Sequence, residues 1–277
     1  MLSDYAKGRN RMKTDVIILC AAAALLSPAP SFSQDLHKQS VGTIVKSQFV
    51  VGKKRVFLPD GDWVLIGASE TIIKQTGSGA PWDLKWGNVL LAQIDGKSVR
   101  ALVRVQGSID AWNITRWTDK SECERTNLLF VNDLSRHIHD FFCNVINHRV
   151  GVLSGDAAEG SLNRRAYLWL EEKQLSAPAT MLVVEYYRST IPGNYLRVQY
   201  YFNPEYDGFA PSAKSGWSQN DWHKDLVGRD ARKVTYVETL KAWSKEMAPV
   251  VDKGFKNESA DPGAYARWPA TKSKPGT

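Results

Sequence analysis

Histidines are the residues of this chain best suited to metal binding or proton transfer, and the sequence contains five of them. His137 and His139 are one residue apart, so on a β-strand both rings would project from one face, as in some metal sites. A zinc site needs a third ligand, which His148 or His223 could supply. The alternative, which we favour, is a polar turn between two strands. We therefore predict no bound metal and no cofactor.

A second polar motif reads Asp221-Trp222-His223-Lys224-Asp225. His223 could act with Asp221 or Asp225 as an acid–base pair, as in a hydrolase. The simpler interpretation is that Asp221 caps the start of a helix, where a carboxylate suits the free N–H groups and the helix dipole. The chain has no His-Glu-x-x-His, Gly-x-Ser-x-Gly, phosphate-binding or dinucleotide-binding motif. The sequence thus favours a protein without enzymatic activity.

A long aromatic connection, residues 203–220, leads into this motif. Loops of this length inside a compact domain are usually functional or disordered, and aromatic residues argue against disorder. We predict that a ligand would bind where this loop meets a helix beginning near Asp221. The predicted contacts are Tyr206, Phe209, Trp217, Trp222, His223 and Lys224. The alternative is that the loop covers the core and buries its aromatic side chains.

The first 33 residues have the pattern of a secretory signal peptide. A basic segment precedes an apolar run at residues 16–27, which is too short to span about 30 Å of hydrocarbon. Ser31-Phe32-Ser33 supplies the small residues before a cleavage site, and Cys20 lacks the sequence context of a lipid anchor. We predict a bacterial periplasmic or secreted protein with no transmembrane anchor after cleavage.

Cleavage would remove four of 36 basic and two of 29 acidic residues, leaving a net charge of +5. This mild excess is spread along the chain, so we predict no nucleic-acid partner. Cys123 and Cys143 would be the remaining cysteines, and two cysteines in an exported chain usually pair. A disulfide between them is therefore expected.

Alternating apolar residues predict two β-hairpins. The first covers residues 89–105 and turns at Asp95-Gly96, a strong signal for a two-residue turn. That turn places one apolar set on one face: Leu90, Ala92, Ile94, Val99, Ala101, Val103 and Val105. The second hairpin turns within residues 191–194. Its apolar faces match only with a three-residue loop, Pro192-Gly193-Asn194, in which Asn194 takes a positive φ.

The same register puts Glu185 opposite the apolar face, so we expect it to be solvated or under a helix end. Two amphipathic helices are predicted, one capped by Ser161 and one between residues 221 and 257 that Pro249 should kink or divide.

Together these elements predict an α+β fold, in which a mostly antiparallel sheet of about seven to nine strands carries both helices on one face. Residues 34–259 would form a single domain, followed by a flexible C-terminal tail at residues 260–277. We expect an exported envelope protein that binds a small ligand or an envelope partner through the aromatic loop. The alternative is a hydrolase or metal-dependent enzyme that uses His223 or the His137/His139 pair.

Overall fold

The computed structural model describes residues 35–74, 83–110, 122–137, 139–191, 193–265 and 267–269. Contacts group the chain from Phe32 onward into one compact unit. The predicted signal peptide, residues 1–33, lies outside the described residues, and so does Pro192 of the expected hairpin loop.

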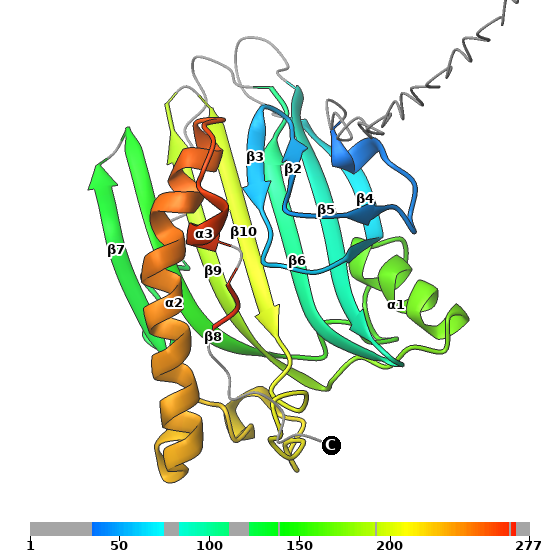
Figure 1. Cartoon of the computed structure of the whole chain (residues 1–277), viewed down its shortest axis with the longest axis vertical. Coiled ribbons are helices and arrows are strands. Elements are labelled where there is room, and N and C mark those ends of the chain that lie inside the picture. Colours follow the sequence, from blue (N-terminus) through cyan, green and yellow to red (C-terminus); the bar gives the residue numbers. More distant parts are fainter. Residues whose placement is uncertain are drawn as a thin grey trace, which may run out of the picture. The chain divides into compact units, whose positions relative to one another are not determined.

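An eight-stranded sheet forms the centre of the fold (Figure 1). Its strands are β1 (Ile44–Val45), β4 (Trp63–Lys74), β5 (Asp83–Asp95), β6 (Ser98–Ser108), β7 (Phe130–His137), β8 (Asp140–Val150), β9 (Thr180–Thr190) and β10 (Asn194–Phe202). They lie in the order β1-β4-β5-β6-β10-β9-β8-β7, and all neighbours are antiparallel. A separate two-stranded sheet contains β2 (Gln48–Val51) and β3 (Lys54–Phe57). The predicted α+β class and strand number are confirmed.

The two main helices cover opposite faces of the sheet, although the sequence led us to expect both on one face. Leu91 and Val103 belong to the core that includes α2 (Ala231–Phe255). Leu90 and Leu102 belong to the core that includes α1 (Leu162–Glu172). Because side chains alternate along a strand, a sheet that is apolar on both faces needs a cover on each. The short elements are η1 (Leu36–Lys38), η2 (Trp217–Gln219), η3 (Val227–Arg229) and α3 (Pro262–Tyr265).

A β-bulge explains why the first hairpin prediction put some residues on the wrong face. Asp95 pairs with Ser98 across a two-residue turn, as expected, but the register shifts between Gln93 and Ile94. Beyond this bulge, one side chain of each predicted pair points to the opposite face. Leu90 and Ala92 therefore lie in the core under α1, whereas Val103 and Val105 lie in the core under α2.

The β9–β10 hairpin has a three-residue loop, as predicted, but the loop lies one position earlier in the sequence. Thr190 pairs with Asn194, so paired residue numbers sum to an even value and the connection is residues 191–193. The positive φ of 52° belongs to Gly193, and the prediction for Asn194 is wrong. Glycine lacks the Cβ atom that makes this conformation unfavourable, so the shifted loop uses the better residue.

Helix α2 begins ten residues later than predicted. Asp230 is its N-cap and accepts a hydrogen bond from the Arg232 N–H at 2.9 Å. Residues 221–230 form turns and a short 3-10 helix instead. At their start, the Asn220 side chain accepts from the Trp222 N–H at 3.0 Å, a local bond that competes with helix formation. The helix continues through Pro249 to Phe255.

Part of the C-terminal segment packs on the same core as α2. The Tyr265 ring lies 4.8 Å from the Phe57 ring, measured between centroids. The Trp268 indole stacks on Trp63 at 5.6 Å and donates a hydrogen bond to the Asp60 carbonyl at 3.0 Å. Tyr265 and Trp268, from the segment expected to be a flexible tail, therefore contact the domain, and the flexibility of residues 260–277 stays a prediction.

Candidate functional site

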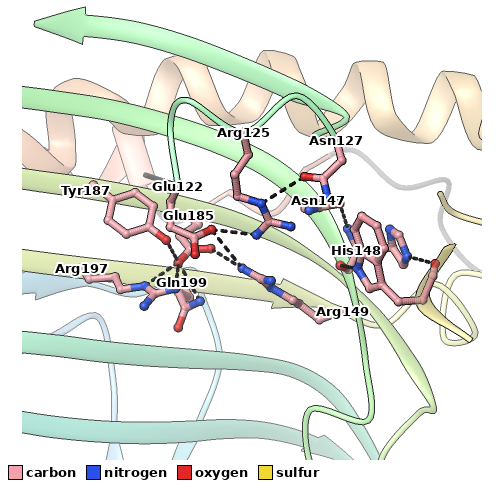
Figure 2. Close-up of polar contacts among 11 residues, drawn as sticks. Glu122, Arg125, Asn127, Asn147, His148, Arg149, Glu185, Tyr187, Arg197 and Gln199 are labelled. Atoms are coloured by element: carbon pink, nitrogen blue, oxygen red, sulfur yellow. Dashed lines mark hydrogen bonds and ion pairs between the residues drawn. The ribbon is translucent and has the colours of Figure 1, made fainter. Parts of the chain in front are cut away.

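A buried carboxylate, Glu185 on β9, is the centre of a charged cluster on the face opposite α2 (Figure 2). Its side chain is 0% exposed and is held by ion pairs with Arg197 and with Arg149, the latter at 3.2 Å. The Tyr187 hydroxyl and the Gln199 amide also donate to it. The prediction that Glu185 would be solvated or under a helix end is wrong, because the chain's own arginines cover it.

Glu185 is held in its ionised form. Burial alone would raise the pKa of this carboxyl, but the guanidinium groups of Arg197 and Arg149 outweigh burial and lower it. A carboxylate whose oxygens accept four donors has no proton to give and is poorly placed to take one. The cluster is therefore a charge-paired structural centre rather than an acid–base pair.

A disulfide-anchored segment closes this cluster from one side. Cys123 and Cys143 form the predicted disulfide, with a Cα–Cα distance of 6.5 Å. The bridge ties the segment to β8 and brings Glu122 within 3.7 Å of Arg149. Arg125 is paired with Glu122 at 2.9 Å. The disulfide thus positions charged groups that satisfy the outer side of the Glu185 cluster.

A second cluster, on the α2 face at the end of β8, contains His148, Trp217 and His223. The His148 ring is fully buried and stacks on Trp217 at 4.9 Å, with an interplanar angle of 16°. Its Nε2 lies 2.9 Å from the Trp217 carbonyl, and its Nδ1 has no partner among the described residues. The His223 ring packs edge-on against both rings. Arg125 lies 6.0 Å from the Trp217 ring, so this indole is held between a ring and a cation.

The histidines predicted as metal ligands lie at opposite ends of β8. His137 and His139 are close to each other at the β7–β8 turn, with ring centroids 5.3 Å apart. His148 and His223 are 5.8 Å apart at the other end. Eight residues of strand separate positions 140 and 148, which corresponds to about 26 Å. Within the described part of the chain, no group of three or more metal-binding side chains comes together.

Of the two carboxylates proposed as acid–base partners of His223, only Asp225 lies near its ring. Its Nδ1 lies 3.5 Å from the Asp225 carboxylate and also accepts the Asp225 N–H at 3.3 Å. The Asp221 carboxylate instead lies 3.6 Å from the Lys233 ammonium. The ring of His223 is largely buried.

The predicted loop residues are not gathered around one hollow. Trp222 is buried, and Phe209 packs edge-on against Trp222 at 4.9 Å and Tyr236 at 5.3 Å. These contacts join the loop to α2. No helix begins at Asp221, so the helix N-terminus that we expected beside this loop is absent from the described structure at that position.

The other predicted contacts face different surroundings. Tyr206 lines a narrow hollow with Arg100 and Trp268, and the Arg100 guanidinium lies about 5 Å from both rings. Lys224 is exposed and donates to the Thr126 carbonyl at 2.8 Å. Whether any of the six residues contacts a ligand stays a prediction.

The largest hollow we describe lies elsewhere, where the β2–β3 turn faces the C-terminal end of α2 and the β9–β10 turn. We call it the cationic hollow. It measures about 800 Å³ and is lined by Val50, Gly52, Lys53, Lys54, Arg55, Arg188, Thr190, Asn194, Phe255, Lys256 and Asn257. Five of these residues are cationic and none is acidic. Its volume is in the range of small-molecule sites, roughly 300–1,000 Å³.

Within the part of the chain that the structure describes, three of the five cations form no ion pair with a carboxylate. Arg188 is paired with Asp140 and, at 2.8 Å, with Asp252, and Lys256 is paired with the same Asp252 at 2.6 Å. Lys53, Lys54 and Arg55, by contrast, form no ion pair with any described residue.

The environment of Lys54 shows how positive this wall is. Its ammonium is buried and donates to the Ser108 carbonyl at 2.7 Å. Burial and then the charge of Lys53 lower the pKa of Lys54 to about 8, against smaller opposing effects of the Asp35 and Asp110 carboxylates. An anion bound beside Lys53, Lys54 and Arg55 would therefore stabilise their charged forms.

Sequence reasoning overlooked this hollow because the positive charge of the whole chain is mild. The available signal was the run Lys53-Lys54-Arg55, which follows Gly52 in the turn of a short hairpin. Three adjacent cations in a turn cannot all lie on one face of a strand. The remaining lining comes from positions 188–194 and 255–257, whose proximity only the fold reveals.

Comparisons with known proteins give no guide to the activity. No protein-family model matches the chain. No curated protein matches it, and no solved structure does. In the described part of the chain, no helix has the length and apolar character needed to cross a bilayer. The function must therefore be argued from the chain's own geometry.

Proposed function

We propose that this is a non-enzymatic binding protein that works outside the cytoplasm and holds an anionic ligand in the cationic hollow. The observation that carries the proposal is the lining of that hollow: five cations, no carboxylate, and a volume of about 800 Å³. Phosphate and carboxylate groups form strong charge-assisted hydrogen bonds with such side chains.

Export is supported by the leader pattern of residues 1–33 and by the Cys123–Cys143 disulfide, since disulfides persist mainly in oxidising compartments. A non-catalytic role is supported by the Glu185 cluster, whose charged groups are paired with one another rather than open to a substrate.

Isothermal titration with inorganic pyrophosphate tests the proposal. The double variant Lys53→Gln/Arg55→Gln should bind pyrophosphate at least about tenfold more weakly than the unchanged protein, because two charge-assisted contacts are lost. The control Lys97→Gln/Arg165→Gln removes the same charge from two exposed positions on other elements. Equal weakening in both variants, or none in either, would show that the hollow does not select anions.

Two alternatives remain open to experiment. The aromatic loop could form a ligand site of its own through Tyr206, Phe209, Trp217, Trp222, His223 and Lys224. The His223–Asp225 contact at 3.5 Å favours testing a hydrolase. Hydrolysis of nitrophenyl esters or phosphates by the purified protein, abolished by His223→Gln, would establish the latter.

A further inference from the structure

A second hollow of about 350 Å³ adjoins the cationic hollow, between β7 and α2. It is lined by Leu134, Ser135, Asp140, Phe142, Arg188, Lys245, Ala248, Pro249, Asp252 and Lys256. Arg188 and Lys256 line both hollows, so the two meet at these side chains. We call the second one the side hollow. A ligand in the cationic hollow could thus extend along α2.

The side hollow has apolar walls that face solvent. Leu134, on the edge strand β7, is 43% exposed. Pro249, on α2, is also exposed, and the buried side chains of Phe142 and Ala248 lie beneath. Exposed apolar groups on two separate elements that line one hollow are more informative than a single exposed leucine.

Pro249 is an unusual residue for its position. Proline in a helix interior destabilises the helix and cannot donate the backbone hydrogen bond to the residue four positions earlier. That residue is Lys245, which also lines the side hollow. Residues that violate a local folding rule are expected at functional sites. Pro249 therefore supplies an independent reason to assign a role to this wall.

The charged groups where the two hollows meet do not repel an anion. The Arg188 guanidinium is paired with Asp140 and, at 2.8 Å, with Asp252, so these three groups carry a net charge of −1. Lys256 is bonded to the same Asp252 at 2.6 Å, which brings the set to neutrality. Lys53 and Arg55, which form no ion pair with a described residue, line the cationic hollow but not the side hollow. Lys245 also lines the side hollow, so its charged lining has three cations and two carboxylates beside the apolar side chains of Leu134, Phe142, Ala248 and Pro249.

We propose that the ligand is a soluble single-chain amphiphilic anion. Its anionic group contacts Lys53 and Arg55, and its alkyl or acyl chain lies against Leu134 and Pro249. This inference rests on the proposed function, because it adds an apolar subsite to the anion site. The small volume of the side hollow suits one chain rather than a bilayer surface.

Three probes separate the two parts of the site: inorganic phosphate, dodecyl phosphate and dodecyl maltoside, each below its micelle concentration. The first has the charge alone, the second has both features, and the third has the chain alone. Titration calorimetry on the full mature chain should give at least about tenfold tighter binding of dodecyl phosphate than of either other probe, because burial of each methylene adds to affinity. Vesicles of anionic phospholipid are a fourth probe, which tests for binding to a membrane surface.

Two leucine variants provide the matched comparison. Leu134→Ser should weaken dodecyl phosphate binding about fivefold and leave phosphate binding unchanged, because it removes apolar contact only. Leu168→Ser changes a similarly exposed leucine on α1, 47% exposed, and should change neither. Both positions are exposed, so both variants are expected to fold, and circular dichroism checks this. Lys53→Gln should weaken both anionic probes.

The outcomes distinguish the inference from the proposed function. Phosphate binding as tight as dodecyl phosphate binding, with Lys53→Gln weakening both, overturns the apolar subsite and leaves the anion site. Failure of Lys53→Gln to weaken either anionic probe overturns both. Strong binding to vesicles without binding of monomeric dodecyl phosphate assigns the surface to a membrane and overturns the soluble ligand.

Discussion

Replacing His148 should reverse the order of stability between the unchanged protein and the variant as the pH falls. Burial, with smaller contributions from the neighbouring His223 and Arg149, lowers the pKa of His148 from 6.5 to about 4, against the opposing effect of the hydrogen bond to the Trp217 carbonyl. The unfolded chain therefore binds a proton between pH 6.5 and 4 that the folded chain does not. Stability that depends on the neutral ring is complete above pH 6.5 and is lost as the pH falls toward 4.

The size of the effect follows from the two pKa values. At pH 5, a group with a pKa of 6.5 in the unfolded chain and about 4 in the folded chain has lost about 2 kcal/mol of its contribution relative to pH 7.5. In His148→Phe the ring still stacks on Trp217, but its hydrogen bond to the Trp217 carbonyl is gone, at a cost of about 1 kcal/mol. The variant should be less stable by about 1 kcal/mol at pH 7.5 and more stable by about 1 kcal/mol at pH 5.

Urea unfolding followed by tryptophan fluorescence at pH 7.5, 6.5 and 5 measures this difference. Carboxylates that titrate in the same range contribute equally to both proteins. The difference in free energy of unfolding between the unchanged protein and His148→Phe therefore reports on His148 alone. His139→Gln, which replaces an exposed histidine at the opposite end of β8, is the matched control variant. If the difference in free energy of unfolding between the unchanged protein and His148→Phe is constant from pH 7.5 to 5, the His148 ring is not held neutral. That result would refute the reasoning from burial.

Three further changes test other parts of the structure. Trp217→Ala should lower the free energy of unfolding by about 3 kcal/mol, because the indole packs on His148, and should leave the affinity for pyrophosphate unchanged. Unchanged stability together with lost binding would assign the ligand to the aromatic loop. Cys143→Ser should lower the melting temperature in oxidising buffer, with about 3 kcal/mol of stability lost, and dithiothreitol should destabilise the unchanged protein but not the variant. Two free thiols in native mature protein would exclude the disulfide. Glu185→Gln should lower the free energy of unfolding by about 3–5 kcal/mol, because Arg149 and Arg197 would lose their buried counter-charge; a urea midpoint within error of the unchanged protein would contradict this.

Sequence patterns predicted local structure well where a single apolar face sets the register. At residues 190–194, the parity argument gave the right pairing because β10 has a clear alternation. At residues 89–105 it failed, because both faces are apolar and either pairing buries an apolar set. The bulge between Gln93 and Ile94 is not marked by glycine or proline. Local pattern therefore cannot distinguish the two registers there.

The site residues were harder to predict, because each depends on contacts between distant segments. Glu185 was assigned to a polar face, correctly, but a polar face can be covered by other charged residues. Arg149 and Arg197 come from two different neighbouring strands. The cysteine pair was predictable because its argument needs only the count and the compartment. Nothing local to Cys123 indicates that the bridge brings Glu122 to Arg149.

The placement of charge gives the best reason to separate a structural part from a binding part of this molecule. On one face, Glu185 is surrounded by arginines whose charges are matched, which suits a cluster that must stay buried and fixed. On the other face, Lys53, Lys54 and Arg55 crowd together unmatched, and the pKa of Lys54 falls to about 8 as a result of burial and of this crowding. Folding alone gains nothing from such crowding, whereas binding an anion relieves it. Within the described residues, the contrast between the paired charges at Glu185 and the three cations without ion pairs at the cationic hollow is what supports the proposal of an anionic ligand.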